Sequence, residues 1–96
     1  MFKVLTTEYF DEWLQKLRDS NAKARIQARI DRAEDGNLGD CKPVGDGVSE
    51  MRIHYGEGYR VYFVQCGKQL VVLLAGGTKK TESKDIRLAI ELAKQL

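Results

Sequence analysis

The sequence is poor in the residues that metal sites and disulfide frameworks need. It has one histidine, one proline and two cysteines among 96 residues, and Cys41 and Cys66 form no Cys-x-x-Cys pair. A multi-ligand metal site is therefore hard to assemble, no cofactor is indicated, and we expect both thiols to be reduced. The chain also lacks an apolar run near the ~20 residues that span a bilayer and a signal-peptide pattern at its N-terminus. These absences predict a cytoplasmic protein that does not associate with membranes.

The residues that are present predict a single globular domain over 1–96. Hydrophobic residues make up 43% and charged residues 31% of the chain, which is enough for one core at this length. The formal net charge is only +2, but the charges are segregated. Acidic residues crowd 8–12 and 31–40. Cations dominate the second half: Arg52, Arg60, Lys68, Lys79 and Lys80.

Local patterns in the first third predict a strand followed by a helical hairpin. Residues 1–5 alternate weakly and form a short strand. Two threonines then offer N-cap hydroxyls for a first helix that carries acidic residues in its first turn. The capping residues at 19–21 mark a tight break. A second helix follows over 22–35 and ends at Gly36.

The rest of the chain predicts a sheet and then a helix. Residues 36–47 are dense in turn formers and predict a loop. Three runs rich in β-branched and aromatic residues are separated by glycine-containing turns, which predicts an antiparallel meander. A terminal helix begins at Thr81 or Ser83. The fold class is therefore α+β, with strands expected at 48–55, 59–66 and 69–75.

The second helix carries two parallel stripes. One is apolar and predicts a buried face, and the other is basic and lies about 100° away around the helix. The basic stripe has two interpretations: a solvated face paired with Asp31 and Glu34, or part of an electrostatic footprint for nucleic acid. The apolar stripe is Ala22, Ile26, Ile30 and Ala33, and the basic stripe is Arg25, Arg29 and Arg32.

Strand registers predict which charged side chains share a face of the sheet. If the loop at 56–58 pairs Tyr55 with Tyr59, then His54 lies beside Arg60 on one face. The same register places Arg52 beside Tyr62 and Glu50 beside Val64. A two-residue turn at Gly67-Lys68 pairs Arg60 with Ala75, and the chain then leaves the sheet at Gly76-Gly77.

This geometry predicts a cationic constellation on the sheet. Like charges at short range repel, so several cations near one spot favour an anionic ligand, and a phosphate suits arginine and lysine well. The alternative is a set of ordinary surface contacts, in which Arg52 pairs with Glu50, Arg60 caps a carbonyl or bridges to the acidic helix segment, and the lysines are solvated. The constellation is Arg52, His54, Arg60, Lys79 and Lys80, with Glu50 at its margin.

Four motifs in this half resemble a known family. They are Gly-Val-Ser-Glu-Met-Arg-Ile, Gly-Tyr-Arg-Val-Tyr-Phe, Leu-Leu-Ala-Gly-Gly-Thr-Lys-Lys and Lys-Asp-Ile. Together with the element order they resemble the RelE/ParE toxin superfamily, in its HigB-like branch of phage-derived addiction-module killer proteins. The resemblance covers essentially the whole chain. It implies a RelE-like fold with an N-terminal strand, a helical hairpin, a three-stranded antiparallel meander and a C-terminal helix.

The resemblance also implies a function. Members that cleave RNA act on messenger RNA at the ribosome and are silenced by a cognate antitoxin, expected here to be a helix-turn-helix protein. Arg60 matches the arginine that contacts the scissile phosphate, and Lys79 and Lys80 match the basic pair after the last strand. Arg52 and Glu50 match the Glu-x-Arg strand signature.

The expected reaction is metal-independent attack of a ribose 2′-hydroxyl on the adjacent phosphorus. Arg60 and Lys80 are expected to stabilise the growing negative charge, and Lys79, Arg52 or His54 to move protons. The tail lacks the C-terminal tyrosine or histidine that several nuclease toxins of the superfamily use. Tyr62, on the same face as Arg60, is a candidate substitute.

Two other functions fit the same sequence. One is a non-enzymatic poison of DNA gyrase, as in the ParE branch, which acts through surface complementarity. The other is a nucleic-acid-binding module without activity, in which the basic stripe and the sheet face form one footprint whose affinity falls steeply with salt.

Overall fold

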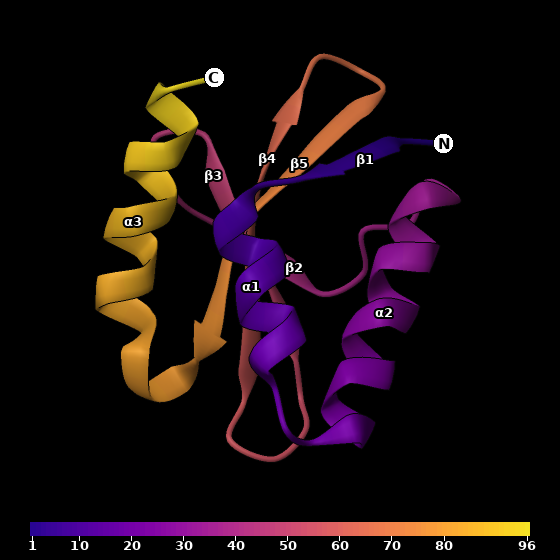
Figure 1. The fold of residues 1–96 in the computed structure, drawn as a ribbon. Helices are drawn as coiled ribbons and strands as arrows, with labels where there is room; N and C mark the ends of the chain where they lie inside the picture. The colour runs from indigo at the N-terminus through magenta and orange to yellow at the C-terminus, as the bar shows by residue number, and fades with distance from the viewer.

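Two helices near the N-terminus begin at residues that cap them. The computed structural model describes residues 1–96, and its helices α1 (Glu8–Lys16) and α2 (Ser20–Glu34) run antiparallel (Figure 1). The Thr7 hydroxyl accepts a hydrogen bond from the Phe10 amide at 3.1 Å, and the Asp19 carboxylate accepts two amide bonds at the start of α2. The predicted helical hairpin is confirmed, with α2 starting two residues earlier than expected.

A five-stranded mixed sheet forms the centre of the molecule. The strand order is β1-β5-β4-β3-β2, with β1 parallel to β5 and all other neighbours antiparallel. The predicted α+β class and the three-strand meander are confirmed, but the meander is the middle of a wider sheet. The strands are β1 (Lys3–Thr6), β2 (Cys41–Gly45), β3 (Val48–Ile53), β4 (Tyr59–Cys66) and β5 (Leu70–Thr78).

Strand β2 lies where the sequence predicts a loop. Turn-forming residues dominate 36–47, but part of this segment forms a short edge strand that pairs with β3. Pro43 lies opposite Ser49 in that pair, and the register shifts between Pro43 and Gly45. A proline is tolerated at an edge, where its missing N–H would face solvent. The prediction of a loop over the whole of 36–47 is therefore wrong.

The register between β3 and β4 differs from the prediction by two residues. Ile53, rather than Tyr55, lies opposite Tyr59, so five residues close the hairpin and Arg52 lies directly opposite Arg60. The predicted neighbours His54 and Arg60 are therefore not a cross-strand pair. A shift of two residues preserves the side-chain alternation, so each side chain still points to the predicted face.

The register between β4 and β5 also differs. Arg60 lies opposite Gly77, not Ala75, because three residues close the second hairpin and a bulge interrupts the pairing between Tyr62 and Phe63. Strand β5 continues through both glycines instead of leaving the sheet there. A Cβ at Gly76 would overlap the Trp13 ring, and one at Gly77 would overlap the Asp85 carboxylate. The glycines thus allow helices to approach the two faces of the sheet closely.

Helices cover both faces of the sheet. The face beneath α1 and α2 is filled by the larger core, in which the predicted α2 stripe is buried, with side chains from β3, β4 and β5. Helix α3 (Glu82–Lys94) covers the other face through Ala89, which packs with Val48, Tyr62 and Leu74. A short 3-10 turn, η1 (Lys79–Thr81), joins β5 to α3. None of the three helices combines the length and the apolar character needed to cross a membrane.

Candidate functional site

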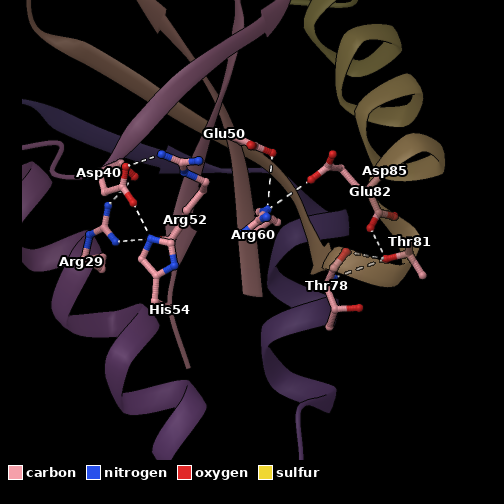
Figure 2. A network of polar contacts seen from close by, with 10 residues as sticks. All are labelled: Arg29, Asp40, Glu50, Arg52, His54, Arg60, Thr78, Thr81, Glu82 and Asp85. Atoms are coloured by element: carbon pink, nitrogen blue, oxygen red, sulfur yellow. Dashed lines mark hydrogen bonds and ion pairs between the residues drawn. The ribbon is translucent and has the colours of Figure 1, made fainter. Parts of the chain in front are cut away.

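Asp40, just before β2, gathers two of the predicted site residues at the molecular surface. Arg52 donates a hydrogen bond from Nη2 to Asp40 Oδ1 at 2.8 Å, and His54 Nε2 lies 2.6 Å from Asp40 Oδ2 (Figure 2). The His54 side chain is 71% exposed. We call these three residues the Asp40 cluster. It leaves an accessible imidazole whose second nitrogen has no hydrogen-bond partner.

The Asp40 cluster combines an ion pair between Asp40 and Arg52 with a hydrogen bond between Asp40 and His54. Hydrogen bonds from Arg52 and then His54 lower the pKa of Asp40 to about 2. The same hydrogen bond, with the charge of Asp40, raises the pKa of Arg52. Asp40 is therefore a carboxylate at any physiological pH. Because its Oδ2 contacts Nε2, it holds the His54 ring in one orientation.

Arg29 of α2 fixes the segment that carries Asp40. Its guanidinium donates to the carbonyl oxygens of Arg52 at 2.5 Å, Leu38 at 3.2 Å and Asp40 at 3.0 Å. Burial lowers the pKa of Arg29, although an arginine remains charged. These hydrogen bonds connect helix α2 and strand β3 to the loop between α2 and β2. They fix the position of the backbone that carries Asp40 and Arg52.

Two hollows meet at His54. The first, which we call the α2–β3 hollow, has a volume of about 180 Å³. The second, the His54–Lys79 hollow, has a volume of about 300 Å³ and lies over the β3–β4 loop. The α2–β3 hollow is lined by Arg25, Ala28, Arg29, Arg32, Arg52, Ile53 and His54, and the His54–Lys79 hollow by His54, Tyr55, Gly56, Glu57, Gly58 and Lys79.

The two lysines after β5 take different positions. The Lys79 amide donates to the Gly58 carbonyl at 2.9 Å, and the Lys79 side chain lines the second hollow along Gly58. A Cβ at Gly58 would contact the lysine stem at 3.5–3.7 Å. The Lys80 ammonium lies 3.6 Å from a Glu57 carboxylate, with 79% of its side chain exposed. Lys79 therefore shares a site with His54, whereas Lys80 lies at its outer rim.

Arg60 points away from this surface. Its side chain is only 8% exposed and lies on the α3 face, where Nε donates to Glu82 Oε2 at 3.3 Å and lies 3.6 Å from Glu50 Oε2 (Figure 2). Glu50 itself is 1% exposed. We call Arg60, Glu50 and Glu82 the Arg60 network. In this arrangement Arg60 ties β3 and β4 to α3.

Tyr62 lies in the core beside the Arg60 network. Its hydroxyl is buried without a hydrogen-bond partner. Burial, with the charge of Glu50, raises the pKa of Tyr62 above its usual range. The residue is fully buried in the cluster beneath α3. In this position it cannot meet a substrate, so it offers no replacement for a C-terminal tyrosine.

The structure brings together part of the predicted constellation. Arg52, His54 and Lys79 line the two joined hollows, but Arg60 and Lys80 have different carboxylate partners and no common contact. Glu50 pairs with Arg60 and not with Arg52. Sequence reasoning missed Asp40, because a turn-forming stretch gives no signal of a tertiary partner. It also missed Glu82, whose only signal was its place in the first turn of a helix.

Comparison with known proteins places the chain in a family. A model of the phage-derived Gp49-like protein family (DUF891) matches residues 12–96. A protein of Haemophilus influenzae (strain ATCC 51907 / DSM 11121 / KW20 / Rd), named only as an uncharacterized protein, is 51% identical over 94 residues. That alignment covers 98% of this chain and 95% of the relative. The chain belongs to the Gp49-like family.

The Gp49-like family is part of the RelE/HigB-like toxin superfamily, so the superfamily resemblance is confirmed. Membership indicates a toxin of a toxin–antitoxin module, and it implies a cognate antitoxin as partner. The Gp49-like match includes α2, the Asp40 cluster and both hollows.

Proposed function

We propose that this Gp49-like protein is a HigB-like toxin of a type II module and a metal-independent endonuclease that cuts messenger RNA at the ribosome in the cytoplasm. The observation that carries the proposal is the exposed His54 imidazole, held by Asp40 at 2.6 Å where the arginine-lined α2–β3 hollow meets the His54–Lys79 hollow. An accessible proton-transfer group between fixed positive charges suits cleavage of a phosphodiester.

The proposed reaction begins with the ribose 2′-hydroxyl. His54 takes its proton, and the freed oxygen forms a bond to the adjacent phosphorus while the bond from phosphorus to the 5′-oxygen breaks. Because Nε2 of His54 faces Asp40, the proton is taken at Nδ1. Lys79, in the same hollow, donates a proton to the leaving oxygen. The products are a 2′,3′-cyclic phosphate and a 5′-hydroxyl.

Fixed cations stabilise the negative charge that grows on the non-bridging oxygens. Arg52 lines the α2–β3 hollow and shares Asp40 with His54, so it is the guanidinium assigned to this role. Arg60 and Lys80 retain the stabilising role that the resemblance implies only if they exchange carboxylates for phosphate. Arg60 would release Glu82, the more exposed of its two partners, and Lys80 would release Glu57. A phosphate can accept two parallel hydrogen bonds from a guanidinium, whereas Glu82 accepts one from Arg60.

The proposal is tested by mapping transcript ends in a translating extract that contains the protein. Wild-type protein is expected to produce new 5′-hydroxyl ends, and His54→Ala protein to leave transcripts whole. The matched control is Arg87→Gln, because Arg87 is an exposed cation of α3 outside both hollows. That variant is expected to cut like the wild type.

Two outcomes would contradict the proposal. Equal cutting by His54→Ala and wild-type protein would remove His54 from the chemistry. Intact transcripts together with accumulating gyrase–DNA breaks would select the gyrase poison instead. The antitoxin is expected to be a helix-turn-helix protein, and co-purification after co-expression of the two adjacent genes tests that partner separately.

A further inference from the structure

The three arginines of the α2 stripe are not neutralised by the acidic residues of their own helix. Asp31 accepts a hydrogen bond from Gln27 instead, at 3.0 Å. No ion pair includes Arg25, Arg29 or Arg32. The expected pairing of this stripe with Asp31 and Glu34 is therefore wrong, although Arg25 and Arg32 are exposed as a solvated face requires.

Instead, the stripe is directed toward β3, where it forms one wall of the α2–β3 hollow. The Arg25 guanidinium lies 4.6 Å from the centre of the Tyr55 ring, a contact that orients it toward the sheet. Arg29 donates three hydrogen bonds to carbonyl oxygens, which are uncharged acceptors and so leave its charge without a counter-ion. Gly39 lies against that guanidinium so closely that a Cβ would come within 2.8 Å of it. Arg32 lines the hollow without a carboxylate partner.

The charge balance of the hollow is strongly positive. Four arginines and His54 line it, and the one carboxylate that contacts any of them is Asp40. Guanidinium groups held close together repel each other. An anion that enters the hollow therefore lowers the repulsive electrostatic energy of the folded protein. Because Arg29 and Arg25 are already oriented, little side-chain freedom is lost on binding.

We propose that the α2–β3 hollow binds a backbone phosphate of the RNA substrate, one that is not cut, and so sets where the strand enters the reaction site. This inference rests on the proposed function. Guanidinium groups bind phosphate oxygens in planar, bidentate pairs. Only Ala28 and Ile53 are apolar in the lining, and the volume is about 180 Å³, so the hollow does not offer the apolar groove that a partner helix needs.

The position of His54 supports RNA rather than a free anion. The imidazole lines both hollows, so a strand whose phosphate occupies the α2–β3 hollow continues past His54 toward Lys79. A non-scissile phosphate held on one side fixes the register of the sugar at His54. Positioning of this kind aligns the 2′-hydroxyl with the phosphorus that it attacks.

Binding is tested with a 2′-O-methylated single-stranded RNA, which cannot be cut because it lacks the attacking hydroxyl. Fluorescence anisotropy gives the association constant of the full chain as a function of salt. The Arg25→Gln/Arg32→Gln protein is expected to bind more weakly, with a log–log salt slope shallower by about 0.7, the value for one lost phosphate contact on a single strand. Arg87→Gln, the matched control on α3, is expected to keep the wild-type slope. Circular dichroism checks that both variants fold.

The outcomes separate this inference from the proposed function. A shallower slope in the double variant alone supports the phosphate site, even if the wild-type protein cuts no transcript. An unchanged slope, or the same change in Arg87→Gln, overturns the site even if cleavage occurs. Loss of the antitoxin complex with an unchanged RNA slope also overturns it, because the hollow would then bind an acidic protein segment.

Discussion

Two arginines that lie directly opposite each other in the sheet have opposite surroundings. Arg52 on β3 faces Arg60 on β4, and like charges in such a pair destabilise a sheet unless each finds its own counter-charge. Arg52 turns to Asp40 at the surface, whereas Arg60 turns to Glu50 and Glu82 under α3. Their side chains are 31% and 8% exposed.

The two residues carry the same charge and differ in burial. Burial therefore distinguishes an arginine that stabilises the fold from one that can contact a ligand. Around Arg60 the solvent is excluded, so the buried side chain of Glu50 depends on this arginine for a counter-charge. Around Arg52 and His54 solvent screens the pair, and a phosphate can compete with Asp40. Arg60, and with it the motif Gly-Tyr-Arg-Val-Tyr-Phe, therefore stabilises the fold through its contacts with Glu50 and Glu82.

The largest effect on stability is expected from Arg60→Ala. This change leaves Glu50 buried without its cation, which costs about 3–5 kcal/mol of the free energy of unfolding. Urea denaturation measures the loss. The matched control is Arg52→Ala on the opposite strand, which breaks an exposed pair and is expected to cost about 1 kcal/mol or less. Equal losses in the two variants would contradict the distinction between the two arginines.

A smaller effect is expected from Glu82→Gln. Glu82 is 39% exposed, and Arg60 retains Glu50 when it is changed. The loss in the free energy of unfolding is expected to be about 1 kcal/mol or less, since a partly solvated pair contributes little. Glu57→Gln, which breaks the exposed pair with Lys80, is the control and is expected to cost still less. A loss as large as that of Arg60→Ala would show that Glu82, and not Glu50, is the main partner of Arg60.

The smallest expected effect is a pH dependence of the free energy of unfolding that originates at Asp40. Its pKa is about 2 in the folded chain against 3.8 for a free side chain, so between these values the unfolded chain binds more protons. The stabilisation is complete above about pH 4 and is lost as the pH falls toward 2. Asp40→Asn protein lacks this component, so its thermal midpoint is expected to fall less than that of the wild type over the same range. Parallel curves for the two proteins would contradict the pairing of Asp40 with Arg52 and His54.

Local signals predicted the helices well. The α2 stripe, the caps Thr7 and Asp19 and the end of α2 depend on residues near each other in sequence, and all of them are found. Tyr9 of α1 and Leu96, which follows α3, are 55% and 66% exposed, so neither belongs to a core.

Pairing between strands was harder to predict. The hairpin loops are longer than the glycine pattern suggested, by two residues in the first and one in the second, and a bulge at Leu74 of β5 adds a further shift. The predicted faces of the side chains were right because the register error between β3 and β4 was two residues, and an even shift keeps the alternation. The site was predicted in part for the same reason: Arg52, His54 and Lys79 follow from strand order, but Asp40 and Glu82 are tertiary partners that no local pattern reports.

The most direct test of the account is the cleavage rate of Asp40→Asn protein in a translating extract, measured beside its affinity for the 2′-O-methylated RNA. The account predicts RNA affinity equal to or tighter than that of the wild type, because a competing carboxylate is gone. It predicts slower cleavage, by up to about 10²–10⁴-fold, because His54 loses the group that orients it. Cleavage at the wild-type rate by this variant would contradict the role of the Asp40 cluster.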